Sequence, residues 1–292
     1  MIRFIIHLRL HYQLFILSGG YLLGGVWVSD LDLTNFWLQF LNVHILLYGG
    51  ATAFNSWWDK DEGPIGGLKN PPEMEPWMRE LSLLIQFAGL IWAFSAGRGF
   101  AVVYGVSMVF FWLYSTPLAR WKGSPVLSLA AIGVSTGTNS VLLGAFAGGG
   151  TLTFELLMAA AGSGLILLSL YPVSQIYQIE EDRKRGDETF AARFGIQGVQ
   201  RFFALAFITG IGLIAFSLFE EMRYISISFA GVGTVAWLLL LFWVYHLKAE
   251  KEEYDEVMKI KFVASLLFVM FLLLVLSARH LSHGIEWTDT LF

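Results

Sequence analysis

The sequence contains no cysteine and few charged residues. With no cysteine among 292 residues, the chain cannot form disulfides, thiolate metal sites or a cysteine nucleophile. Charged residues make up 14% of it, against about 25% in soluble domains, which excludes an ordinary soluble globular protein. The formal net charge of −4 is small. It provides no polybasic surface, so nucleic acid is not expected as a partner.

Long apolar runs rich in aromatic residues take the place of those charges. Hydrophobic residues make up 56% of the chain, with 25 Phe and 11 Trp. A run of about 20 apolar residues crosses the hydrocarbon core of a bilayer. We therefore expect an all-α polytopic membrane protein, with residues 1–292 in a single domain. Nine transmembrane helices are predicted, at roughly 12–29, 35–55, 80–97, 99–116, 125–148, 152–177, 200–219, 224–247 and 260–279.

Basic residues are distributed unevenly between these runs. With the N-terminus in the cytoplasm, one membrane side holds all but three of the 19 lysines and arginines, and the other holds only Arg98, Arg223 and Arg279. The positive-inside rule then places the N-terminus in the cytoplasm and the C-terminus outside. The long charged loops lie on the cytoplasmic side, which we expect to be the working face. No targeting segment is recognised, so a prokaryotic inner membrane is the simplest expectation.

A polar stripe runs through the second predicted helix. A stripe of this kind inside a membrane helix is costly and is expected to face a cavity or a partner. Asp61 and Glu62 follow it, and nearby glycines allow the backbone to come close to a ligand. The members of the stripe, spaced three or four residues apart and so on one helical face, are His44, Tyr48, Thr52, Asn55 and Asp59.

A second polar stripe ends the sixth predicted helix. It consists of Tyr171, Gln175, Gln178 and Asp182. Two carboxylate-bearing helix ends on one membrane side form a natural clamp for Mg²⁺, which prefers oxygen ligands and bridges carboxylates to substrate phosphates. The alternative interpretation of either segment is a solvated acidic loop. Basic residues of the same loops, expected to neutralise phosphates, are Lys69, Arg120, Lys122, Arg183 and Lys184.

Small and polar residues inside the apolar runs predict close helix packing. Gly20 and Gly24, like Gly133 and Gly137, are four residues apart and would share a helix face. Asn139 is expected to form a hydrogen bond between helices.

The two polar segments resemble the UbiA superfamily of intramembrane prenyltransferases. The family's first motif is Asn-Asp-x-x-Asp-x-x-x-Asp. Asn55 and Asp59 match it, whereas Ser56 and Gly63 stand where the family has Asp. In the family's second motif, Asp-x-x-x-Asp and the residues after it, Gln178 stands in place of the first Asp. The matching residues of that motif are Asp182, Arg183, Gly186, Thr189, Arg193 and Gly195. The segment from Tyr114 to Lys122 resembles the family's Tyr/Pro/Lys loop.

This resemblance implies a helical bundle around a central cavity, capped by the loops at about 55–79 and 175–199. It further implies that Mg²⁺ bridges the Asp-rich motifs to a prenyl diphosphate, and that the prenyl group passes to a lipophilic acceptor, aromatic or isoprenoid. The expected metal ligands are Asn55, Asp59, Asp61 and Asp182, and the expected catalytic residues are Asp59, Lys122 and Asp182. The expected substrate-binding residues are Asn55, Lys69, Tyr114, Arg120, Lys122, Tyr171, Gln175, Gln178, Arg183 and Lys184.

Other activities stay open on the same residues. A membrane terpene cyclase would capture the carbocation within the prenyl chain and need no acceptor. A prenyl-lipid binding protein without catalysis is suggested by Gly63 and Gln178, because fewer carboxylates weaken Mg²⁺ binding. A secondary transporter is less favoured, since few charges lie in the middle of the spans.

Overall fold

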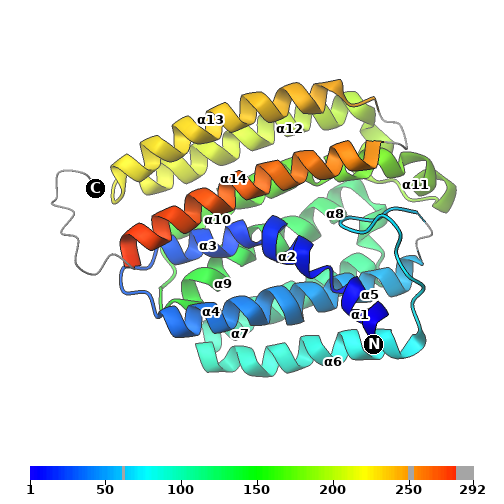
Figure 1. The fold of residues 1–292 in the computed structure, drawn as a ribbon, viewed down its shortest axis with the longest axis horizontal. Helices are drawn as coiled ribbons and strands as arrows, with labels where there is room; N and C mark the ends of the chain where they lie inside the picture. Colours follow the sequence, from blue (N-terminus) through cyan, green and yellow to red (C-terminus); the bar gives the residue numbers. More distant parts are fainter. Residues whose placement is uncertain (61–62, 249–252, 281–292) are drawn as a thin grey trace.

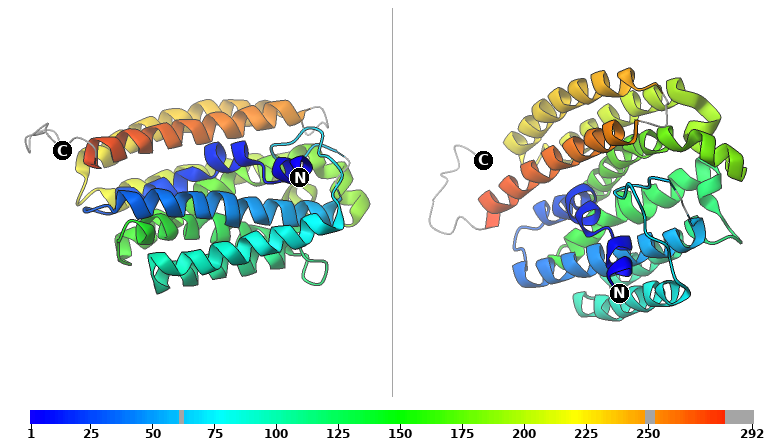
Figure 2. Two further views of the ribbon diagram at one scale, coloured as in Figure 1. Left: turned by 60° about the horizontal axis from the view of Figure 1, so that its bottom comes forward. Right: turned by 45° about the vertical axis from the view of Figure 1, so that its right-hand side comes forward.

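The computed structural model describes residues 1–60, 63–248 and 253–280, and within them the chain is helical throughout. No strand forms in these ranges, where Ile65 and Leu68 make one isolated bridge. The helices lie side by side along the long axis of the molecule (Figure 1). Two further views place α6 at one outer edge of the bundle and α13 at the other (Figure 2). The predicted all-α fold is confirmed.

The described residues up to Ser115 form seven α-helices with a π-helical and a 3-10 insertion. The π-helix η1 continues α4 into α5, so the second predicted span is a single rod with a locally widened turn. The bounds are α1 Ile2–His7, α2 Leu10–Ile16, α3 Ser18–Val26, α4 Leu33–Leu41, η1 Asn42–Gly49, α5 Gly50–Asp59, α6 Pro76–Ala93, η2 Phe94–Ala96 and α7 Arg98–Ser115.

The second half repeats this mixture of regular and modified helix. A π-helix, η4, joins α8 to α9, and a 3-10 helix, η5, leads from α10 into α11. The bounds are η3 Trp121–Gly123, α8 Pro125–Ile132, η4 Gly133–Thr138, α9 Asn139–Ala147, α10 Phe154–Leu170, η5 Pro172–Gln178, α11 Ile179–Arg185, α12 Phe190–Leu218, α13 Arg223–His246 and α14 Tyr254–His280.

Six helical segments in the described ranges are long and apolar enough to cross a membrane. They are Arg98–Ser115, Pro125–Ala147, Phe154–Arg185, Phe190–Leu218, Arg223–His246 and Tyr254–His280. The first three predicted spans fall on α2 with α3, on α4 through α5, and on α6, which are helical but lie outside these six. Nine membrane spans and the orientation of the termini therefore stay predictions.

Close packing of small residues joins the helices at the centre of the bundle. A Cβ atom added to Gly24 of α3 would lie 2.1 Å from the Val141 carbonyl oxygen of α9. One added to Gly137 would lie 2.7 Å from the Gly164 Cα atom of α10. These backbones approach each other as the glycine spacing predicted. Asn139 donates to the Ser107 hydroxyl oxygen of α7 at 2.9 Å, which confirms the expected hydrogen bond between helices.

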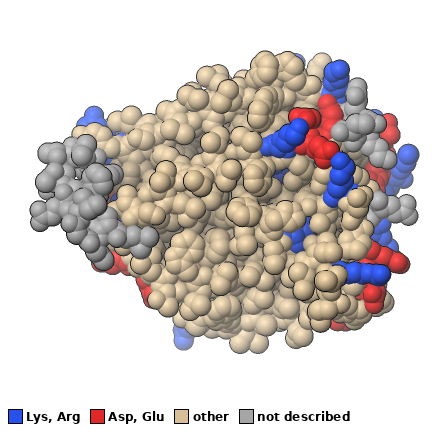
Figure 3. Space-filling model, viewed as in Figure 1, with Lys and Arg blue, Asp and Glu red and all other residues tan. Residues whose placement is uncertain are grey.

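Charged side chains occupy the ends of the molecule. On the face shown in Figure 3, most of them gather at the end where α11 lies, and the broad band between the two ends is almost free of charge. An uncharged band across this face of a bundle of apolar helices is the surface expected in a bilayer.

Candidate functional site

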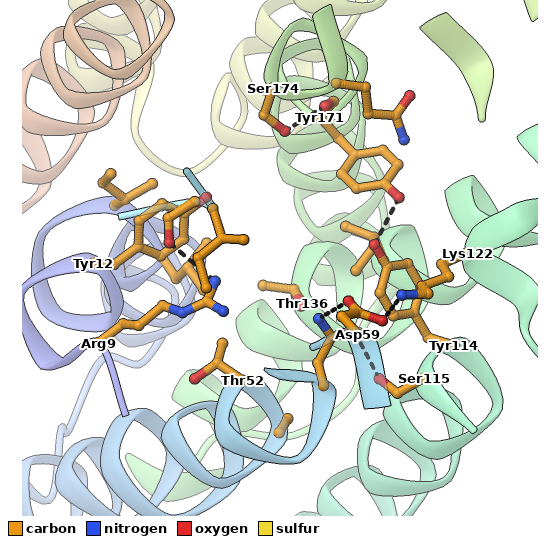
Figure 4. A pocket seen from close by; sticks show the side chains of 18 of the residues that line it. Arg9, Tyr12, Thr52, Asp59, Tyr114, Ser115, Lys122, Thr136, Tyr171 and Ser174 are labelled. Atoms are coloured by element: carbon orange, nitrogen blue, oxygen red, sulfur yellow. Dashed lines mark hydrogen bonds and ion pairs between the residues drawn. The ribbon is translucent and has the colours of Figure 1, made fainter. Parts of the chain in front are cut away.

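A pocket of about 240 Å³ opens where α5 and α11 lie, between α2, α7, α10 and α14. Its walls come from both halves of the chain, and Figure 4 shows Arg9 and Tyr12 on one side with Asp59, Lys122 and Tyr114 on the other. Most of the predicted site residues meet here. Those that line the pocket are Asn55, Asp59, Tyr114, Lys122, Tyr171, Gln175, Gln178 and Asp182.

Each carboxylate oxygen of Asp59 contacts another side chain. It is the last residue of α5, and its side chain is 8% exposed. Its Oδ2 accepts a hydrogen bond from the Asn55 amide nitrogen at 2.7 Å, and its Oδ1 forms an ion pair with Lys122 Nζ. Ser115 donates to the Asn55 amide oxygen at 3.0 Å. The spacing of four residues between Asn55 and Asp59 thus fixes the direction of the carboxylate.

Lys122 brings a buried positive charge to the same wall. It lies in η3, in the connection between α7 and α8, and is 8% exposed. Burial lowers the pKa of its ammonium group to about 8, although the carboxylate of Asp187 acts in the opposite direction. At neutral pH the ammonium remains the main form, which suits contact with an anion.

Asp182 and Asp187 complete the acidic side of the pocket. Both side chains are buried, at 8% exposure each. The Asp182 Oδ2 accepts from the Thr189 hydroxyl at 2.9 Å. The two oxygens of Asp187 accept from Arg120 Nε and Nη2, at 2.9 and 2.8 Å. Gln178 donates to the Pro64 carbonyl oxygen at 3.2 Å and so links the two motif segments.

These side chains suit a magnesium ion that takes some ligands from the protein and the others from a substrate. Among the described residues, no group of three acidic or histidine side chains forms a metal cluster. Mg²⁺ commonly takes only one or two protein carboxylates and completes its shell with water and substrate phosphates. Asp59 and Asp182 line one pocket and would supply those two. Because Lys122 already contacts Asp59, the pocket fits Mg²⁺ arriving with a diphosphate better than a resident ion.

Several predicted site residues lie outside the pocket lining. Lys69 is exposed and forms an ion pair with Asp255 at 2.7 Å. Arg120 forms an ion pair with Asp187. Arg183 and Lys184 are exposed on α11. Asp61 lies outside the described residues. The substrate and metal roles of these residues stay predictions.

Sequence reasoning missed four charged residues and one tyrosine that line the pocket. They are Arg9, Tyr12, Arg185, Asp187 and Lys261. The three basic residues among them, Arg9, Arg185 and Lys261, carry the same sequence signal whether they face water or a cavity, so they were counted only toward the positive-inside rule. Arg9, Tyr12 and Lys261 stand in a predicted span or within one helical turn of it, whereas Arg185 and Asp187 lie further along the charged segment that follows residue 177.

The pocket continues into an apolar chamber of about 80 Å³. The two spaces adjoin, because six residues line both: Ile16, Leu17, Thr136, Leu167, Leu170 and Ser265. Aromatic rings of the inner chamber come from Phe207, Phe229, Phe268 and Phe271. In the outer pocket the Tyr114 and Tyr171 hydroxyls are 3.0 Å apart. A charged mouth that leads to an apolar, aromatic interior suits an amphipathic anion.

Solved structures with the same fold are known. A UbiA homolog from Archaeoglobus fulgidus bound to GPP and Mg²⁺ superposes with a TM-score of 0.73 at 16% identity, over 94% of this chain and 99% of that one. The same homolog bound to DMAPP and Mg²⁺ gives 0.72 at 17% identity, over 94% and 99%. Digeranylgeranylglyceryl phosphate synthase gives 0.64 at 16% identity, over 95% and 100%.

No curated protein matches the sequence significantly. The sequence model of the UbiA prenyltransferase family, in contrast, matches residues 14–271. That range includes most residues that line the pocket, from Ile16 on α2 to Ser265 on α14. The chain therefore belongs to the UbiA prenyltransferase family.

Proposed function

We propose that this protein is a Mg²⁺-dependent intramembrane prenyltransferase, which moves a prenyl group from an allylic prenyl diphosphate to a lipophilic acceptor. One observation carries the proposal: Asp59 and Asp182, which end two distant polar stripes, face one pocket together with the buried Lys122. The family and the fold it shares with GPP-bound and DMAPP-bound homologs support the same reading.

The residues of the pocket have distinct tasks in this proposal. Lys122 and Arg185 attract the diphosphate. Asp59 and Asp182 would hold Mg²⁺, whose charge would stabilise the leaving group. The bond between the prenyl carbon and the diphosphate oxygen breaks, and its electron pair leaves with the diphosphate. An acceptor nucleophile then bonds to that carbon and gives up a proton.

Aromatic side chains suit the carbocation that forms between those two events. Tyr48, Phe111, Tyr114 and Tyr171 are among the residues that line the pocket. Their ring faces attract a cation within about 6 Å, and more strongly where water is excluded. The apolar chamber behind them would hold the prenyl tail away from solvent.

The test is diphosphate release from geranyl diphosphate by protein reconstituted in lipid vesicles. The assay compares Mg²⁺ with EDTA, and compares vesicles with and without an acceptor pool extracted from membranes of the source organism. Asp59→Asn and Asp182→Asn should each reduce release at least about 100-fold. Glu180→Gln, an exposed neighbour of Asp182 on α11, is the matched control and should keep full activity.

Each rival activity has its own outcome in this assay. Mg²⁺-dependent release without acceptor, with a cyclic hydrocarbon product, would establish a terpene cyclase. Tight geranyl diphosphate binding that ignores Mg²⁺, with no release under any condition, would establish a binding protein. The ion pair of Lys122 with Asp59 is the reason to test the alternative of a binding protein without catalysis.

A further inference from the structure

A groove of about 560 Å³ adjoins the central pocket. It lies between α1, the end of α5 and the connection that leads into α6. Of the described residues, Ile65 alone lines both spaces. Pro71, Pro72 and Pro76 form part of the groove wall, and because a proline ring fixes φ, this part of the wall is stiff. The groove is therefore a second, preformed site on the chain.

Two opposite charges line this groove without pairing with each other. Lys60 follows the last residue of α5, and Glu73 lies in the connection to α6. Both side chains are exposed, and within residues 1–60, 63–248 and 253–280 neither forms an ion pair. The nearby Glu75, in contrast, pairs with Arg3 at 3.6 Å. A groove that presents one free positive and one free negative charge suits a ligand that carries both signs.

The indole of Trp57 narrows the choice of cation for that ligand. Lys60 Nζ lies 5.7 Å from the centre of the ring, and the guanidinium carbon of Arg79 lies 5.8 Å from it. The ring thus already has two cationic partners, whereas a quaternary ammonium needs free aromatic faces. A primary ammonium needs instead an oxygen that accepts its N–H hydrogen bonds, which the Glu73 carboxylate offers.

The groove lies at the depth expected for lipid headgroups. The end of α5 and the start of α6 lie at the end of the bundle where α11 lies (Figure 1), which on the face shown in Figure 3 is the charged end. Trp57 lines the groove, and Trp77, in the first turn of α6, is 37% exposed. Tryptophan beside basic residues at the ends of apolar helices marks the boundary between membrane and water.

The neighbouring α1 adds an apolar surface at the same depth. Its Ile2, Ile5 and Ile6 are 75%, 48% and 40% exposed, whereas Phe4 and His7 are buried, and His7 lines the groove. An amphipathic helix of this kind lies in the plane of the interface with its apolar residues among acyl chains. A lipid whose headgroup occupies the groove would have its chains beside these isoleucines, so the surroundings favour a lipid over a free headgroup compound.

We propose that this groove binds a phospholipid with an ethanolamine headgroup. Lys60 contacts the phosphate, and Glu73 accepts hydrogen bonds from the primary ammonium. The bound lipid joins the end of α5 to the connection that carries Ile65, a residue of the central pocket wall. The proposal is independent of the reaction, because neither Lys60 nor Glu73 lines the central pocket.

Native mass spectrometry of the delipidated full chain in detergent micelles tests this assignment. The protein is titrated with dioleoyl phosphatidylethanolamine, phosphatidylcholine and phosphatidylglycerol, which have the same acyl chains. Wild-type protein should bind the ethanolamine lipid at least about tenfold more tightly than either of the others, since only that lipid offers both a phosphate and N–H donors. Free phosphoethanolamine at the same concentration should not displace it.

Single substitutions separate the two charges. Glu73→Gln should abolish the preference for the ethanolamine lipid over phosphatidylglycerol, and Glu73→Asp should keep it. Lys60→Met should weaken ethanolamine-lipid binding at least about fivefold, whereas Lys60→Arg should retain it. Lys259→Met replaces an exposed lysine of α14 that pairs with Glu256, and as the matched control it should behave as wild type.

Hydrogen exchange places the bound lipid on the chain. In wild-type protein the ethanolamine lipid should slow exchange of the amides at 73–75 relative to phosphatidylcholine, and in Glu73→Gln the two lipids should give equal rates. Equal affinity of wild-type protein for the ethanolamine and choline lipids would overturn the proposal. So would tighter binding of phosphatidylglycerol, an unchanged preference in Glu73→Gln, or displacement by free phosphoethanolamine, which would make the ligand a soluble compound.

Discussion

At the scale of single residues, two of the three pocket aspartates are paired with basic side chains. Asp59 is paired with Lys122, and Asp187 accepts two hydrogen bonds from Arg120. Sequence reasoning gave Arg120 to the diphosphate, because a basic residue beside a motif loop suggests phosphate binding. The structure gives its guanidinium a partner within the protein, which indicates a role in holding the loop that carries Lys122.

Arg120→Met should lower the free energy of unfolding by about 1–3 kcal/mol, because it leaves the buried Asp187 carboxylate without its partner. Asp187→Asn in the same chain should recover part of this loss. A coupling energy near zero in the double-mutant cycle, measured by denaturant titration in mixed micelles, would contradict a direct pair.

Gly24 gives a second prediction at this scale. A methyl group on Gly24 would collide with the Val141 carbonyl oxygen at 2.1 Å and the Ala145 nitrogen at 2.6 Å. Gly24→Ala should therefore force α3 and α9 apart and cost about 1–3 kcal/mol. Gly231→Ala on α13, where nothing lies within 4 Å, is the control and should leave the melting temperature unchanged or raised. Equal melting temperatures for the two variants would be inconsistent with this packing.

At the scale of helices, hydropathy and periodicity predicted where each helix lies but not how it deviates from a regular rod. The apolar run at 12–29 predicted one helix, whereas α2 ends at Ile16 and α3 begins at Ser18. Asn42–Gly49 and Gly133–Thr138 are π-helical, and Pro172–Gln178 is a 3-10 helix. These modifications depend on packing against neighbours, which composition along one helix does not report.

The polar stripes were predictable because polar residues inside an apolar helix are costly in a bilayer and therefore stand out in the sequence. Asp59 and Asp182 were identified for that reason, and both line the pocket. Lys261 was not, since it stands four residues before Ser265 at the start of an apolar run and resembles any flanking lysine. Only the fold, which brings α14 against Tyr12 of α2, shows that its charge is buried.

The connection between α5 and α6 depends on a contact with α1. His7 is 2% exposed, and its Nε2 donates to the Pro72 carbonyl oxygen at 2.8 Å. Burial lowers the pKa of His7, the hydrogen bond to Pro72 opposes this, and the charge of Arg9 reinforces it. The folded state thus favours the neutral imidazole of His7. When the loop opens, the exposed imidazole takes up a proton more readily.

Acidification should therefore loosen this connection. Stability from a histidine with a lowered pKa is complete above the ordinary value of 6.5 and declines as the pH falls below it. Hydrogen exchange of the amides at 65–70, corrected for intrinsic rates, should speed up several-fold between about pH 7.5 and about pH 5.5. His7→Gln removes the titrating group, and in that variant the same change of pH should have no such effect. An identical pH response in both proteins would assign it to another group.

At the scale of the whole molecule, the distribution of charge predicts which end faces the cytoplasm. The end with α11 carries most of the charged side chains on the face shown in Figure 3, and it also carries the mouth of the pocket. The diphosphate group of the proposed prenyl donor is highly charged, so it would meet this mouth from the aqueous side rather than from the lipid core. Under the proposed function, the orientation of the bundle would decide which compartment supplies the donor.

The absence of cysteine makes this orientation directly measurable, because any cysteine introduced is the sole thiol in the chain. Lys184→Cys on α11 and Thr151→Cys between α9 and α10 replace exposed residues from opposite ends of α10. With the N-terminus inside, a membrane-impermeant maleimide should label Thr151→Cys in intact cells and Lys184→Cys only in inverted vesicles. The reverse pattern would move the pocket mouth to the outer face. Labelling of both from one side would mean that α10 does not span the membrane.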